Sequence, residues 1–184
     1  MTANLATGST VPQFITGFDE TAFVEAVEGG SLFAAADDTN LLLFPDTGDV
    51  GTGGNGTDVL QGNGGDDNLQ GAGGNDFVFG NDGDDIVRGD EGDDVVVGGL
   101  GSDLAIGGPG SDVFEFFSST VVEGELDIIR DFEVGLDSIV VVGSTEVSYD
   151  DQSGSLFVDG IEAATLTAGL DLEVLTRSDS SVIF

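Results

Sequence analysis

Seven aspartates recur every nine residues through the middle of the chain, each after a short glycine-containing stretch. They are Asp58, Asp67, Asp76, Asp85, Asp94, Asp103 and Asp112. Carboxylates and backbone carbonyls are hard oxygen donors, and Ca²⁺ binds roughly six to eight such oxygens at about 2.3–2.6 Å. The spacing therefore predicts a series of divalent-cation sites built on oxygen ligands.

The aspartates occupy the sixth place of a nine-residue repeat. From Gly53 onward the chain reads GGNGTDVLQ, GNGGDDNLQ, GAGGNDFVF, GNDGDDIVR, GDEGDDVVV, GGLGSDLAI and GGPGSDVFE. Glycine holds places one and four, where it permits a positive φ and a close approach of the backbone to an ion. Places seven to nine predict a short strand whose middle side chain points inward, because strand side chains alternate. The predicted inward residues are Leu60, Leu69, Val78, Val87, Val96, Ala105 and Phe114.

A period of this length predicts an all-β fold, a right-handed parallel β-roll with ions in its turns, in which two repeats complete one coil. Turns on one edge then recur every eighteen residues. Asp58, Asp76, Asp94 and Asp112 are expected to stack along one edge, and Asp67, Asp85 and Asp103 along the other. An ion between each stacked pair makes five framed sites.

The seven copies closely resemble the repeats-in-toxin (RTX) family of secreted calcium-binding proteins, whose roll is of the haemolysin type. In that family, one turn supplies the carbonyls of places two and four and its aspartate, and the turn above supplies the carbonyls of places one and three and its aspartate. The resemblance implies these ligand sets: Gly54, Gly56 and Asp58 with Gly71, Gly73 and Asp76; Asn63, Gly65 and Asp67 with Gly80, Asp82 and Asp85; Ala72, Gly74 and Asp76 with Gly89, Glu91 and Asp94; Asn81, Gly83 and Asp85 with Gly98, Leu100 and Asp103; and Asp90, Gly92 and Asp94 with Gly107, Pro109 and Asp112.

The predicted sites differ in the acidity around them. Leu100 and Pro109 stand where other turns carry acidic residues, so the later sites are expected to be weaker. Asp49 is in register with Asp67 and offers a sixth site.

Glycine- and aspartate-rich tracts are often flexible linkers, which is the alternative interpretation of residues 53–115. A linker, however, has no reason to keep an apolar residue at every eighth place. Without calcium the acidic, glycine-rich segment is expected to be disordered, because self-repulsion and backbone entropy oppose ordering. Calcium binding and folding are therefore expected to be coupled.

Charge and composition exclude several function classes. The formal net charge is −33, and the only basic residues are Arg88, Arg130 and Arg177, so nucleic acid is repelled. The sequence contains no run of eighteen apolar residues, so membrane insertion is not expected. The chain has no His and no Cys, which removes Ser-His and Cys-His nucleophiles and the usual zinc ligands. We therefore expect no enzyme activity.

Residues 1–52 lack the glycine and aspartate pattern and allow two interpretations. Extending the nine-residue register backwards places Ile15, Val24, Phe33 and Leu42 at the inward position, which predicts calcium-free coils starting near Gly8. Gly51 at an inward place is the weak point of this interpretation. The alternative is a cap with a short helix near residues 19–28, where Asp19 or Thr21 could cap the start and Gly29 the end.

Residues 116–184 predict a C-terminal β cap. The segment DIIRDFEVGLDSIVV from Asp127 resembles the stretch that often follows RTX arrays, and residues 147–160 predict a hairpin. The ending DSSVIF resembles the uncleaved type I secretion signal of Gram-negative bacteria, cyanobacteria included. Residues 1–10 have neither a basic start nor an apolar run, so export to the outside or the cell surface is expected to use this C-terminal signal.

Apolar residues at the outward places seven and nine call for a cover. They are Phe77, Phe79, Val95, Val97 and Val113 on one face and Ile86, Leu104 and Ile106 on the other. The cover is either the chain's own C-terminal strands or another copy, since exposed apolar patches usually mark contact surfaces. Two functions follow: a self-associating extracellular filament, surface-layer or matrix protein, which we favour, or a monomeric calcium-dependent secretion, folding or adhesion module.

Overall fold

The computed structural model describes residues 40–144 and 146–166 in full, and the backbone of four further strands at residues 23–26, 31–33, 175–176 and 181–183. All regular structure in these residues is β. This part of the chain contains no helix long and apolar enough to cross a membrane.

The strands form two sheets, which we call the odd sheet and the even sheet after their strand numbers in the roll. The odd sheet has the order β1 (Phe23–Ala26), β3 (Asn40–Leu43), β5 (Val59–Gly64), β7 (Phe77–Asp82), β9 (Val95–Leu100), β11 (Val113–Phe117), β13 (Ser138–Val142), β18 (Ser181–Ile183) and β17 (Leu175–Thr176). The even sheet has the order β2 (Ser31–Phe33), β4 (Val50–Thr52), β6 (Asn68–Gly73), β8 (Ile86–Glu91), β10 (Leu104–Ile106), β12 (Asp127–Ile129), β16 (Ile161–Thr165), β15 (Ser155–Val158) and β14 (Val147–Asp150).

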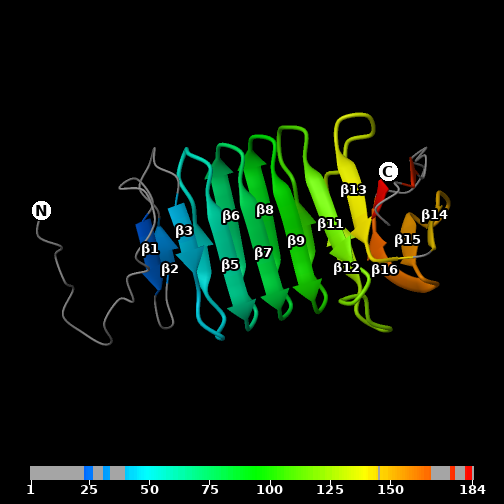
Figure 1. Cartoon of the computed structure of the whole chain (residues 1–184), viewed down its shortest axis with the longest axis horizontal. Helices are drawn as coiled ribbons and strands as arrows, with labels where there is room; N and C mark the ends of the chain where they lie inside the picture. The colour runs from blue at the N-terminus through cyan, green and yellow to red at the C-terminus, as the bar shows by residue number, and fades with distance from the viewer. Residues whose placement is uncertain are drawn as a thin grey trace, which may run out of the picture.

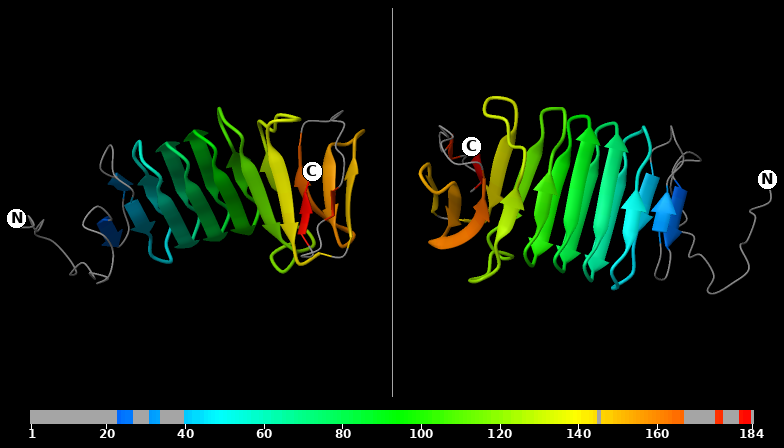
Figure 2. Two further views of the ribbon diagram at one scale, coloured as in Figure 1. Left: turned by 45° about the horizontal axis from the view of Figure 1, so that its top comes forward. Right: turned by 180° about the vertical axis from the view of Figure 1, so that it is seen from behind.

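The two sheets face each other and run the length of an elongated molecule (Figure 1). Strand numbers rise along the long axis from β1 to β13 in the odd sheet and from β2 to β12 in the even sheet, and tight turns connect the sheets at both edges. The views from other sides show the same two layers (Figure 2). The predicted β-solenoid with two strands to each coil is therefore confirmed.

Parallel pairing keeps an offset of eighteen residues through the repeats. Leu60 pairs with Val78 and Val78 with Val96 in the odd sheet, while Leu69 pairs with Val87 in the even sheet. All seven predicted inward residues are buried, with exposed fractions of 0–6 %. They stack into one narrow column of core between the sheets.

The coil before the repeats keeps the same offset. Leu42 pairs with Leu60, and Gly51 pairs with Leu69. The inward glycine has a physical reason, because a Cβ on Gly51 would collide with the ring of Phe44. Phe44 is buried and fills the space that a side chain at residue 51 would occupy.

The first two strands continue both sheets in parallel, but not in the predicted register. Val24 pairs with Leu41 instead of Leu42, and Phe33 pairs with Thr52 instead of Gly51. From Asn40 onward, where the structure describes side chains, hydrogen bonds to the aspartate eighteen residues later lock the offset.

The helical alternative fails at residues 23–26, which form strand β1. Residues 19–22 and 27–28 of the expected helix lie outside the described residues. So do Gly8 and Ile15 of the expected calcium-free coils.

Beyond the repeats the chain adds strands to the ends of both sheets. β11 pairs with β13 over five residues, and β12 pairs with β16, both in parallel. The predicted hairpin is present as the antiparallel pair β14 and β15. The ring of Phe132 packs on that of Phe114 with centroids 6.1 Å apart, which joins the C-terminal core to the column of the repeats.

These C-terminal strands extend the sheets edge to edge and do not lie across their outer faces. The predicted intramolecular cover is therefore wrong for the described strands. Most outward apolar side chains are half-buried by their neighbours in the same sheet. Two differ: Phe77 remains 42 % exposed, whereas Val97, which pairs with Phe79, is buried.

Candidate metal sites

The place-six aspartates form a hydrogen-bonded ladder along each edge of the roll. The backbone N–H of each of the first five, Asp58 to Asp94, donates to Oδ1 of the aspartate eighteen residues later. The donor–acceptor distances are 2.8 Å for Asp58 to Asp76, 2.7 Å for Asp67 to Asp85, 2.7 Å for Asp76 to Asp94, 2.8 Å for Asp85 to Asp103 and 3.0 Å for Asp94 to Asp112. The sequence repeat thus brings together every stacked pair that it predicts.

The second carboxylate oxygen of the ladder is buried without a partner. This holds for Oδ2 of Asp67, Asp76, Asp85, Asp94, Asp103 and Asp112. Each of these residues is at most 3 % exposed. A buried carboxylate oxygen with no donor is costly, which indicates a cation as its missing partner.

The glycine at place one leaves room for this oxygen. A Cβ on Gly53 would collide with Oδ2 of Asp58 and with the carbonyl oxygen of Gly71 in the turn above. Both oxygens lie so near the position of that Cβ that they are within about 5 Å of each other, and one Ca²⁺ can bridge two oxygens at this separation. Gly62, Gly71 and Gly80 meet the same two kinds of oxygen.

The predicted reason for the glycine at place one is thus only half right. Close approach is required there, but the positive φ occurs at places two and four. Place two adopts it even without glycine, as at Asn63 with φ 70° and Asp90 with φ 72°.

Backbone carbonyls of both turns point into the gap between them. The place-four carbonyls of Gly65 and Gly74 lie against the place-four glycines of the turns above, Gly83 and Gly92. In the opposite direction, the place-three carbonyl of Glu91 accepts from the N–H of Gly74 at 2.8 Å. These are the carbonyl positions that the RTX resemblance implies as ligands.

Two ladder carboxylates frame each gap, and near Asp94 the Oδ2 of Asp90 is also buried without a partner. In the described part of the chain, no three acidic side chains gather around one point. Such a site would draw most of its ligands from the backbone, which implies modest affinity because ligand charge governs calcium binding strength.

Burial and like charge perturb the ladder carboxyls. Removal from water raises the pKa of Asp103 to about 8, and the charges of Asp127 and Asp85 add to the increase, while a hydrogen bond from the Asp85 backbone opposes it. Burial similarly raises the pKa of Asp76 to about 7 and that of Asp67 to about 6. Arg88, a basic residue of the even sheet, donates to Oδ1 of Asn68.

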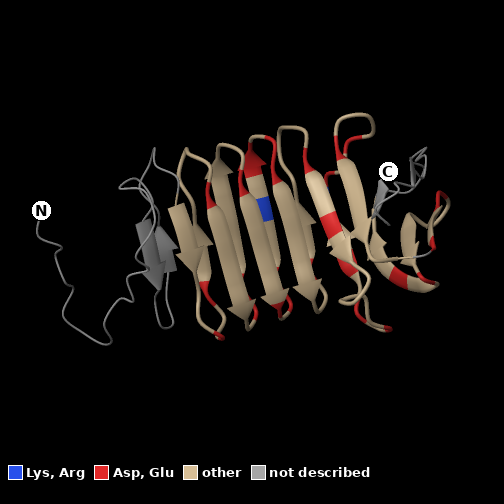
Figure 3. Cartoon of the chain, in the orientation of Figure 1, with Lys and Arg blue, Asp and Glu red and all other residues tan. Residues whose placement is uncertain are grey.

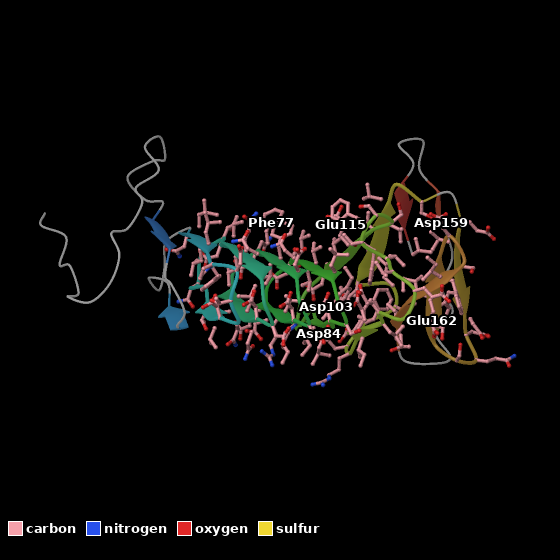
Figure 4. The ribbon with its side chains drawn as sticks, turned by 90° about the horizontal axis from the view of Figure 1, so that it is seen from below. Phe77, Asp84, Asp103, Glu115, Asp159 and Glu162 are labelled. Atoms are coloured by element: carbon pink, nitrogen blue, oxygen red, sulfur yellow. The ribbon has the colours of Figure 1, made fainter. Side chains whose placement is uncertain are left out.

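Acidic residues concentrate at the turns on both edges, and basic residues are almost absent from the sheets (Figure 3). In the view along the strands, Asp103 lies between the sheets and Phe77 projects from the outer surface (Figure 4). The charges that need neutralising are therefore lined up in two rows.

The ladders extend past the repeats at both ends. At the start, Asn40 and Asp49 donate their N–H groups to Oδ1 of Asp58 and Asp67. At the far end, Asp103 and Asp112 donate to Oδ1 of Asp127 and Asp137, at 2.9 Å and 3.0 Å.

The sequence interpretation missed Asp127 and Asp137 as members of the ladder. The signal was present, because each aspartate comes two residues before a buried isoleucine, Ile129 or Ile139, as in the repeat. Their offsets of 24 and 25 residues break the eighteen-residue count.

Comparison with protein families decides the identity of the repeats. Residues 52–87 and 79–114 match the model of the RTX calcium-binding nonapeptide repeat, which comprises four copies. The repeat region is an RTX β-roll. No curated protein matches the chain.

The RTX β-roll stacks the place-six aspartates of successive turns in pairs. The unpartnered Oδ2 atoms and the hollows kept open by place-one glycines fit Ca²⁺ between stacked turns. Calcium would supply the positive charge that the two aspartate ladders lack.

Proposed function

We propose that this protein folds around calcium outside the cell and acts there as a non-catalytic structural component that self-associates. The observation that carries the proposal is the row of six buried, unpartnered Oδ2 atoms in the two ladders. When these carboxyls ionise in the fold they repel one another, and burial without counter-charge opposes the fold. Calcium removes both penalties, so the roll forms where calcium is abundant.

Secretion fits this dependence. Extracellular calcium modules bind with dissociation constants of about 10⁻⁴–10⁻³ M, so sites of that strength are empty in the cytosol and filled outside. RTX repeat proteins are typically secreted by type I systems of Gram-negative bacteria. We assign the acidic and apolar ending DSSVIF as the export signal, and residues 181–183 of this ending form strand β18.

Self-association is supported by apolar rows on the outer faces. In the odd sheet Val59, Phe77, Val95 and Val113 pair consecutively, and Phe77 is the most exposed of them. In the even sheet Ile86, Leu104 and Ile128 pair consecutively, and Ile128 is 49 % exposed. Because the chain carries a charge of −33, copies are expected to associate only after calcium lowers their repulsion.

The alternative is a monomeric calcium-dependent secretion, folding or adhesion module. It is favoured by the antiparallel strands β14 and β15, which end the even sheet at its C-terminal side and interrupt the parallel stack. The non-catalytic assignment is common to both proposals, because the chain lacks the His and Cys of the usual nucleophilic sites.

Circular dichroism and light scattering during one calcium titration separate the two. Assembly predicts a β signal followed by growth in particle size, and magnesium should produce neither at equal concentration, because Mg²⁺ demands octahedral geometry. Phe77→Ser should reduce the particle growth without moving the folding midpoint, whereas Gln61→Ser on the adjacent strand should change neither. Folding to a monomer at high protein concentration would contradict assembly and favour the module.

A further inference from the structure

One edge of the roll carries Asp67, Asp85 and Asp103. The gap above its last turn is closed by a segment outside the repeats. β10 pairs in parallel with β12 across an offset of 24 residues. Residues 107–126 thus form a longer connection between neighbouring strands of the even sheet than the other coils do. The loop at residues 118–126 lies over the turn that ends at Asp103. A small cavity is left between them, lined among others by Gly99, Gly101, Glu125 and Asp127.

Asp103 is an unsatisfied ligand at this gap. Its Oδ2 has no hydrogen-bond partner, and the residue is only 2 % exposed. Oδ2 turns back towards Gly98, where a Cβ would collide with it. Asp67 and Asp85 show the same arrangement lower on this edge, but no repeat lies above Asp103 to complete the site.

The loop supplies acidic side chains where a repeat would supply its own ligands. Asp127 takes the place of the next aspartate, because its Oδ1 accepts from the N–H of Asp103 at 2.9 Å. Glu125 takes the place of a backbone carbonyl, because its Oε2 accepts from the N–H of Gly101 at 3.2 Å. In lower turns that place-four N–H donates to a place-three carbonyl, as Gly83 does to Leu100.

The opposite edge ends differently. There, Asp131 accepts from the N–H groups of both Gly107 and Gly108, and Asp137 accepts from those of Asp112 and Glu133. The carboxylates of Asp131 and Asp137 are thus occupied in capping backbone donors, while Oδ2 of Asp112 is unpartnered like that of Asp103. The cavity and the glutamate are features of the Asp103 edge.

We propose that Asp103, Glu125 and Asp127, together with the carbonyls of Gly99 and Gly101, bind a further Ca²⁺ at the junction between the repeats and the C-terminal cap. The inference rests on calcium binding by the roll and adds a site that the repeat pattern does not predict. The three carboxylates do not share one point before the ion binds, since Glu125 is held at Gly101. With one more charge than a repeat site, this site binds more tightly.

Calcium counting by equilibrium dialysis tests the site. Glu125→Gln keeps an oxygen that can accept from Gly101, so the loop is expected to fold, but it removes a ligand charge. At a free calcium concentration that fills this site but not the weaker repeat sites, this variant should bind one ion fewer, with about tenfold weaker affinity for that ion. Glu123→Gln is the matched control, because Glu123 lies exposed in the same loop and its loss should change nothing.

Asp127→Asn provides a second test, since the amide oxygen can replace the acceptor for Asp103. It too should lose one ion while keeping the β signal in saturating calcium. Wild-type stoichiometry and affinity in Glu125→Gln would overturn the site and leave the repeat sites intact. A wild-type protein that binds no calcium would instead overturn the proposed function itself.

Discussion

Each place-six aspartate serves two neighbouring turns. Oδ1 accepts the backbone N–H of the rung below, and Oδ2 lies in its own turn beside the place-one glycine, as in Asp76 and Gly71. One oxygen therefore sets the register of the coils, and the other is available to an ion. The same aspartate side chain therefore sets the register of the coils and offers a ligand to the ion, so a substitution there alters both.

A pair of glycines in one turn tests this geometry. A Cβ on Gly71 would collide with Oδ2 of Asp76, whereas a Cβ on Gly73 would have its nearest neighbour at 3.6 Å. Gly71→Ala should raise the calcium concentration needed for half-folding by about tenfold or more, while Gly73→Ala should leave it nearly unchanged. Circular dichroism during calcium titration measures both midpoints. Equal midpoints for the two variants would show that place one does not shape the site.

Along an edge of the sheets, the carboxyls act as a coupled row. Their folded pKa values, about 6 for Asp67, about 7 for Asp76 and about 8 for Asp103, lie above the unfolded value near 3.9. The folded protein therefore binds more protons than the unfolded chain between about pH 4 and pH 8. In the absence of calcium its stability must fall as the pH rises through that window.

Urea unfolding in calcium-free buffer at pH 5 and pH 8 checks the sign. A measurable urea midpoint is expected at pH 5, because protonation removes the repulsion that calcium otherwise neutralises, whereas at pH 8 the calcium-free chain is expected to be largely unfolded before urea is added. Addition of calcium at pH 7 should release protons into an unbuffered solution. A calcium-free midpoint that rises with pH would mean that the ladder carboxyls are ionised at no cost.

At the same scale, the period of the repeat was sufficient to predict both sheets. Nine-residue spacing determines the eighteen-residue offset, and the inward residues from Leu60 to Phe114 follow from strand alternation. The flanks were not predictable in this way. Phe44 fills the hollow of Gly51 from another position in the chain, and the long loop before Asp127 hides its place in the ladder.

The whole molecule is a narrow column of apolar side chains between two acidic edges. Such a core is thin, and the nineteen glycines of residues 53–115 lose much conformational entropy on ordering. The net charge of −33 adds repulsion across the entire length. The column is therefore expected to form only when cations occupy the edges.

The most direct test of this account is far-ultraviolet circular dichroism of the full chain at pH 7.5, first in excess chelator and then in saturating calcium. The account predicts a largely unfolded spectrum in chelator, a cooperative gain of β signal with calcium, and reversal when chelator is restored. An unchanged β spectrum in chelator, with the same resistance to urea as in calcium, would contradict it.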